Sequence, residues 1–140
     1  PVYGRMLLLA NTTAFTLTSQ NVWYESGLTH EKLVYGMQNI TGTERFLTPY
    51  QGVYRVTFLA TVTHSVGSTI EIAIGPTGLG STTYTSASCP TGVLTNIAYE
   101  NILELNQASA VYPTYQNKTG AGAALTVKHM QFLVEMVRKV

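Results

Sequence analysis

Aspartate is absent from this chain of 140 residues, and cysteine occurs only once, as Cys89. Without aspartate, the chain lacks the commonest ligand of hard cations such as Ca²⁺ and the usual acidic member of a hydrolytic triad. A single cysteine cannot form an intramolecular disulfide, so we interpret Cys89 as a buried structural thiol. These absences argue against a calcium or magnesium site, a hydrolytic triad and a disulfide framework.

Charged residues are scarce, at 11% of the sequence against a usual share of about 25%. The net charge is +1, and the basic residues are scattered from Arg5 to Lys139 instead of forming a cluster. A protein that binds nucleic acid needs a basic surface that follows the phosphates, so we expect no nucleic-acid partner.

Long apolar runs are missing as well. The stretch from Met6 to Ala10 has only the length of a strand, whereas a membrane helix needs ~20 apolar residues, so we expect no membrane partner. The same stretch is too short for a secretory signal and lacks a small-residue cleavage site. Pro1 is a residue from which an initiator methionine is readily removed, and we therefore expect the chain to begin at its natural start.

Threonine is the most frequent residue, and its branched side chain suits strands better than helix interiors. No segment shows a sustained helical period with caps. Short alternating or apolar runs bounded by Gly, Pro, Asn or Ser instead predict strands throughout the chain. They lie near 3–9, 14–18, 21–25, 32–36, 44–48, 51–63, 69–75, 81–86, 93–105, 109–116 and 124–137.

Three segments define the faces of the predicted sheets, because side chains alternate between the two faces of a strand. The alternation predicts a core that contains Tyr54, Val56, Phe58, Ala60, Val62, Ile70, Ile72, Ile74, Met130, Phe132, Val134 and Met136. We expect a wetter opposite face at Thr69, Glu71 and Ala73. The short linker Val66-Gly67 predicts that the strands before and after it form a hairpin.

Many short strands without crossover helices predict one all-β domain over residues 1–140, built as an antiparallel β-sandwich or a barrel. A jelly roll fits best, although periodicity alone does not separate it from an immunoglobulin-like sandwich. The missing Cys, Trp, Cys spacing excludes only the commonest version of that sandwich. The glycine-rich segments 75–80 and 120–122 supply the backbone freedom that tight turns need.

A family resemblance extends over nearly the whole chain. The residues that carry it are Asn11–Leu17, Asn21–Tyr24, Leu33–Tyr35, Gly52–Val62, Ile70–Gly75, Leu103–Leu105 and the closing apolar strand. This pattern resembles bacteriophage virion proteins whose domain is similar to the trimeric jelly roll of the tumour necrosis factor and complement C1q families. The chain departs from the pattern at Asn106–Ser109, where those proteins usually have a Gly-Asp turn, although Asn and Ser can form such a turn.

Residues that could carry catalysis do not form a recognisable group. His30, His64 and His129 lack the spacing of a metal site, and no nucleophile elbow or phosphate-binding loop occurs. Glu100 and Glu104 share a predicted strand face but lie about 13 Å apart, too far for a glycosidase pair. We therefore expect no enzyme activity, no cofactor and no metal.

The function that we expect is structural. The resemblance implies a virion protein, either a capsid decoration (cement) protein or a head-fibre subunit, that binds other virion proteins such as the major capsid protein. One alternative is a receptor- or carbohydrate-binding domain of a phage tail fibre, in which Trp23 and surface tyrosines stack on a host surface glycan. A second is an extracellular ligand of the C1q or tumour necrosis factor type, against which the missing signal and collagen-like region argue. A fibre tip normally follows a shaft, whereas the strand near 3–9 already belongs to this domain.

A homotrimer is expected from apolar residues on both faces of several strands, such as Val53 and Leu59 opposite Tyr54 and Phe58. A sandwich needs only one apolar face per sheet, so the second face requires a partner. Tyrosine, which occurs nine times, suits interfaces. The candidate subunit interface comprises Tyr112, Tyr115, His129, Leu133 and Val137.

Overall fold

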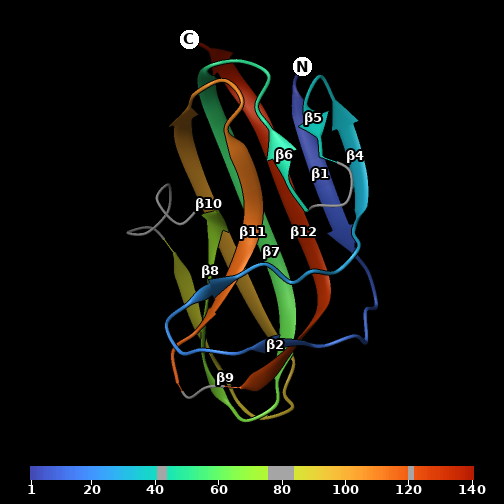
Figure 1. Cartoon of the computed structure of the whole chain (residues 1–140), viewed down its shortest axis with the longest axis vertical. Helices are drawn as coiled ribbons and strands as arrows, with labels where there is room; N and C mark the ends of the chain where they lie inside the picture. Colours follow the sequence, from blue (N-terminus) through green and yellow to red (C-terminus); the bar gives the residue numbers. More distant parts are fainter. Residues whose placement is uncertain (41–43, 76–83, 120–121) are drawn as a thin grey trace.

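Residues 1–40, 44–75, 84–119 and 122–140, the part of the chain that the computed structural model describes, contain strands and connecting loops but no helix. The strands within these ranges form two antiparallel sheets that pack face to face (Figure 1). They are β1 (Tyr3–Leu8), β2 (Phe15–Leu17), β3 (Trp23–Tyr24), β4 (Glu31–Tyr35), β5 (Gln38–Asn39), β6 (Phe46–Leu47), β7 (Gly52–His64), β8 (Ser68–Gly75), β9 (Thr85–Cys89), β10 (Thr95–Leu105), β11 (Ala110–Asn117) and β12 (Ala123–Lys139).

The first sheet has the order β10-β7-β12-β1-β4, and β2 also pairs with β12. The second sheet has the order β5-β6-β11-β8-β9, and β3 also pairs with β11. The long strands β7, β10 and β12 run along the long axis of the molecule (Figure 1). The predicted all-β class and antiparallel sandwich are confirmed.

The predicted strands agree with the observed ones to within a few residues, with two exceptions. The short strand β5 was not predicted. A strand was predicted at 81–86, whereas β9 begins at Thr85 and residues 81–83 lie outside the described part. The turns predicted at 75–80 and 120–122 also fall largely outside it.

The predicted hairpin between β7 and β8 is wrong. Strand β7 pairs with β10 and β12 in the first sheet, whereas β8 pairs with β9 and β11 in the second. The turn at Gly67, whose φ is +71°, therefore carries the chain from one sheet to the other. Alternation along each strand determines which side chains are buried, but it does not determine which strands pair. The predicted β7–β8 hairpin was wrong for this reason.

The core lies between the two sheets. All the residues predicted for it from β7, β8 and β12 are buried except Met136, which is half-buried against the core. At its centre the ring of Phe58 makes edge contacts with the rings of Phe132 and Tyr115, each with ring centroids 5.5 Å apart.

The wetter face expected on β8 is not observed, because Glu71 and Ala73 are buried. The neighbouring strand β11 is buried on both faces, and Thr114 Oγ1 donates a hydrogen bond to the carbonyl of Ala73 at 2.9 Å. The carboxylate of Glu71 lies 3.8 Å from the ammonium of Lys118. In the second sheet, the polar side chain of Glu71, which the sequence predicted to be exposed to solvent, is therefore buried and has a polar partner.

The turn at Asn106–Ser109 forms without the Gly-Asp pair. Thr48 Oγ1 donates to the carbonyl of Asn106 at 2.6 Å, and the amide of Ala108 donates to the carbonyl of Thr48 at 2.8 Å. These bonds hold Ala108 at a φ of +60°, a conformation that a residue with a side chain adopts only when its surroundings fix it.

Two buried tyrosines give a matched test of this core. The hydroxyl of Tyr115 has no hydrogen-bond partner among the described residues, whereas that of Tyr54 donates to the carbonyl of Tyr50 at 2.7 Å. We expect Tyr115→Phe to leave the free energy of unfolding unchanged or raise it, and Tyr54→Phe to lower it by about 1 kcal/mol. Chemical denaturation at one fixed protein concentration measures both. A larger loss for Tyr115→Phe than for Tyr54→Phe would contradict this assignment.

Candidate functional site

The outer face of the first sheet is the candidate site, and its side chains follow from the same alternation that builds the core. Strand pairing across β4, β1, β12, β7 and β10 brings the outward side chains into rows that cross the sheet. One such row comprises Leu33, Arg5, Leu133, Thr57 and Glu100. The next row comprises Glu31, Leu7, Gln131, Leu59 and Ala98.

Apolar side chains remain exposed on this face. Leu59 is 43% exposed, Ile102 54% and Leu33 49%, although each lies within a paired strand and not in a loop. At the edge of the face the rings of Tyr3 and Tyr35 are stacked, with centroids 6.0 Å apart. Exposed apolar side chains gathered on one face of a sheet are typical of surfaces that contact another molecule.

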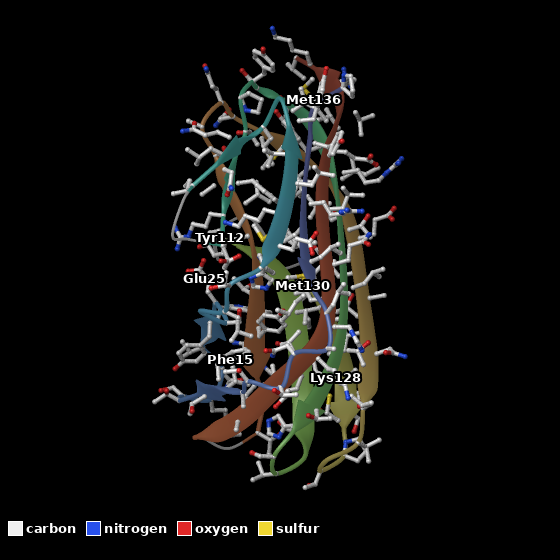
Figure 2. The ribbon with its side chains drawn as sticks, turned by 90° about the vertical axis from the view of Figure 1, so that its right-hand side faces the viewer. Phe15, Glu25, Tyr112, Lys128, Met130 and Met136 are labelled. Atoms are coloured by element: carbon white, nitrogen blue, oxygen red, sulfur yellow. The ribbon has the colours of Figure 1, made fainter. Side chains whose placement is uncertain are left out.

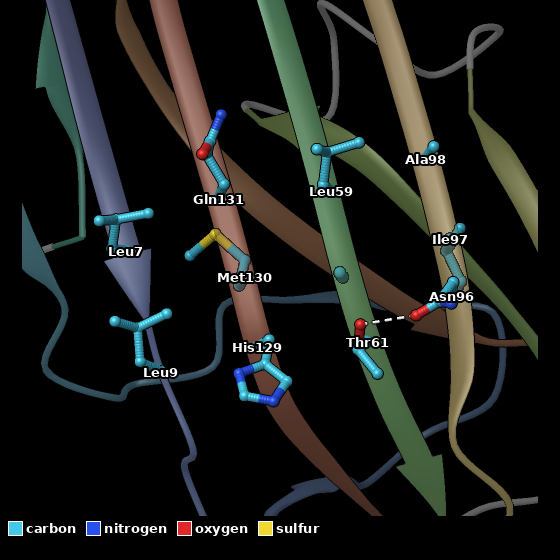
Figure 3. Close-up of a pocket in the computed structure, with 11 residues that line it drawn as sticks. Leu7, Leu9, Leu59, Thr61, Asn96, Ile97, Ala98, His129, Met130 and Gln131 are labelled. Atoms are coloured by element: carbon cyan, nitrogen blue, oxygen red, sulfur yellow. Dashed lines mark hydrogen bonds between the residues drawn. The ribbon is translucent and has the colours of Figure 1, made fainter.

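A hollow with a volume of about 420 Å³ opens on the same face (Figure 3). Thr61 Oγ1 donates to Asn96 Oδ1 at 2.7 Å on one side, and His129 stands on the other. Its remaining lining is mostly apolar and comes from Leu7, Leu9, Leu59, Ala60, Ile97, Ala98, Met130 and Gln131.

A β-bulge in β12 places His129 on this face. Pairing with β7 shifts by one residue between Val127 and His129, so that Lys128 has no partner on β7. Odd-numbered residues of β12 are buried before the bulge and even-numbered ones after it. As a result His129 and Leu133 point outward, while Met130, labelled on β12 in Figure 2, points into the core.

The five residues predicted for a subunit interface do not lie together. His129 is exposed and Leu133 half-buried on the outer face of the first sheet, and Val137 is 52% exposed at a second bulge of β12. Tyr115 is 1% exposed, so its ring has no surface left for another subunit.

Tyr112 belongs to the other side of the molecule (Figure 2). Its ring lies against Gly75, where any side chain would collide with it, and the guanidinium of Arg45 covers it at 4.1 Å from the centroid. Arg45 also donates to both carboxylate oxygens of Glu25, at 3.1 and 2.9 Å. Both tyrosines therefore take part in the chain's own packing, on a strand, β11, that is buried on both faces.

Four residues of this face were not predicted from the sequence. They are Arg5, Leu7, Leu33 and Ile102, which strand pairing brings onto it. A signal for two of them was present, since Arg5 and Leu7 alternate with the buried Met6 and Leu8.

Two histidines are buried elsewhere. The Nδ1 atom of His30 lies 2.6 Å from a carboxylate oxygen of Glu44. The ammonium of Lys32 lies 3.9 Å from the same oxygen. Burial lowers the pKa of His30, although Glu44 opposes this shift. Burial also lowers the pKa of His64, whose Nδ1 accepts a hydrogen bond from the amide of Val66 at 3.2 Å.

Within the described ranges, no three His, Cys or Glu side chains come together as a metal site would require. No helix with the length and apolar content of a membrane span occurs in the same ranges. Cys89 is buried, and burial raises the pKa of its thiol.

The architecture is the jelly-roll sandwich of C1q and tumour necrosis factor domains. The globular domain of zebrafish complement 1qA superposes with a TM-score of 0.64 at 14% identity, covering 100% of both chains. Murine APRIL at pH 5.0 gives a TM-score of 0.59 at 14% identity, covering 97% of this chain and 100% of APRIL. The structure of murine APRIL at pH 8.0 gives a TM-score of 0.58 at 12% identity, covering 96% of this chain and 99% of APRIL. No family model and no curated protein matches the sequence.

The buried histidines predict a pH dependence of stability. Because the folded state lowers the pKa of His64 below its unfolded value of about 6.5, the unfolded state binds more protons once the pH falls below that value. Stability is then complete above pH ~6.5 and declines as the pH falls below it. We expect His64→Gln to reduce this decline. His129→Gln, at an exposed position, is the control and retains it. Denaturation curves with no pH dependence between about pH 7 and pH 5 would contradict the prediction.

Proposed function

We propose that this chain is a non-enzymatic structural protein that assembles as a homotrimer through the outer face of its first sheet. The observation that carries the proposal is the set of exposed apolar side chains that paired strands hold on that face, among them Leu33, Leu59 and Ile102. A closed ring covers such a face on every subunit without recruiting further copies. An interface of roughly 800 Å² per partner is the usual size of a stable contact.

We further propose that the trimer is a capsid decoration or head-fibre subunit on a bacteriophage virion, bound to the major capsid protein. Support for the virion comes from the sequence resemblance over Gly52–Val62 and the flanking strands. The sandwich fold is compatible with it, and equally with an extracellular ligand of the C1q or tumour necrosis factor type. Mass spectrometry of purified particles, combined with electron microscopy, tests the location directly.

Leu133→Glu is the sharpest test of assembly. Leu133 lies in the middle of its row on the outer face, between the buried Phe132 and Val134, so a carboxylate there changes the surface and leaves the core intact. We expect the unmodified chain, of 15.2 kDa, to have the mass of a trimer in light scattering, and the variant to have that of a folded monomer. Val66→Glu, at a 63% exposed position in the β7–β8 connection, is the control and stays trimeric. A monomeric unmodified chain at micromolar concentration refutes the proposal.

A second candidate function is binding of a host surface glycan, as in a tail-fibre tip. The observation that favours it is an aromatic pair, Trp23 and Tyr84, with ring centroids 6.5 Å apart and Tyr84 48% exposed. Aromatic faces with a polar tip suit contacts that are part apolar and part wet, as those with sugars are.

A glycan array tests this second function. We expect binding, if it is the function, to be lost in Tyr84→Ala and kept in Tyr50→Ala, a tyrosine that is 42% exposed elsewhere. Equal signals from the unmodified chain and both variants would count against a glycan site at this pair.

A further inference from the structure

Arg5, on the proposed interface face, is a cation that no described residue pairs with. It lies on β1, paired in register with Leu33 of β4 on one side and Leu133 of β12 on the other. The side chain is half-buried, and its Nε atom is shielded from solvent with no hydrogen-bond partner among the described residues. A shielded charge that lacks a counter-charge destabilises the structure unless another molecule supplies one.

The carboxylates closest to Arg5 in the strand register do not supply it. Glu135, two residues along β12 from the partner of Arg5, receives a hydrogen bond from Arg55 at 3.2 Å. Glu31, two residues along β4 from the partner of Arg5, is exposed. Within the described ranges, none of the ion pairs involves Arg5.

Glu100 is the complementary group, on the edge strand β10 of the same sheet. It is exposed on β10, and it occupies the same row as Arg5, through Leu133 and Thr57. Three strand spacings of about 4.8 Å separate β1 from β10, roughly 14 Å in all, and two side chains lie between them. Arg5 and Glu100 of one chain are therefore too far apart for a direct ion pair.

Rotational symmetry would bring the outer side of β1 in one subunit together with the edge strand β10 of its neighbour. A threefold axis parallel to the strands leaves the height of every residue along that axis unchanged, so only residues at equal height meet across the interface. The strands of the first sheet follow the long axis of the molecule (Figure 1), and strand pairing puts Arg5 and Glu100 at one height. Glu104 lies four residues further along β10, about 13 Å away.

We propose that the guanidinium of Arg5 pairs with the carboxylate of Glu100 of the neighbouring subunit at each of the three interfaces. This inference rests on the trimer proposed above, and it identifies which strands of neighbouring subunits meet. The contact is heterologous, since β1 of one subunit faces β10 of the next, and such a contact closes into a ring when the rotation is one third of a turn. Opposite charges at one height fix the register between subunits and disfavour a shifted arrangement.

Charge reversal tests the pair. We expect Arg5→Glu and Glu100→Arg each to raise the dissociation constant of the trimer by on the order of tenfold or more, because like charges then meet at the interface. The double variant, Arg5→Glu with Glu100→Arg, again places opposite charges at the interface with their positions exchanged. Its dissociation constant should return to within a few-fold of the unmodified value. Arg5→Glu combined with Glu104→Arg is the matched control, with the same net charge on the same strand and face, and it should not recover.

Sedimentation equilibrium gives these constants, and circular dichroism verifies that each variant is folded. If Arg5→Glu fails to fold, Glu100→Gln replaces it, because this position is exposed and the change leaves the core untouched. Added salt should then weaken the unmodified trimer more than the Glu100→Gln trimer.

The outcomes separate the two proposals. Suppose that the unmodified chain is a trimer but that the double variant weakens it as much as the two single variants together. That result overturns the Arg5–Glu100 pair and leaves the trimer itself supported. The same holds if Glu104→Arg rescues Arg5→Glu as well as Glu100→Arg does. A monomeric unmodified chain overturns the trimer itself, and the pair with it.

Discussion

The pairing of β7 with β12 is the interaction on which the rest of the molecule depends. These two long strands run antiparallel through the middle of the first sheet, and Phe58 and Phe132 meet across them with their ring centroids 5.5 Å apart. Every side chain that this pairing turns inward fills the space between the sheets, and every other one is turned outward. The outward face is thus a geometric by-product of the core, and it leaves several apolar side chains exposed.

The bulge at Lys128 divides β12 into two halves that fill different parts of the core. Before it, Leu125 and Val127 close one end of the sandwich, and after it, Met130 and Phe132 fill the centre. A continuous alternation through this strand would have turned one of these two sets toward solvent. The single extra residue keeps both halves in the core and also sets His129 at the rim of the hollow. Bulges of this kind redirect side chains while leaving the strand pairing intact on either side.

Much of the fold was predictable from local pattern, and much of the site was not. The inward faces of β7 and β12 follow from alternation, because only one face of each is buried. The same logic failed for β11, where Tyr112 and Tyr115 are both buried, since a strand covered on both faces has no alternation to reveal its orientation. Arg5 was overlooked because its role depends on which strands lie beside β1, and strand partners distant in the sequence leave no local trace.

The position of β12 has a consequence for how the chain folds. This strand is made after all the others, yet it lies in the interior of its sheet, between β7 and β1. Strand β1, made first, therefore finds its central neighbour only when more than a hundred intervening residues have been synthesised. Contacts between such distant segments incur a large loop-closure entropy and slow the folding reaction. Until β12 is in place, β7 and β1 each present an unpaired strand edge, and open edges of this kind favour association between chains.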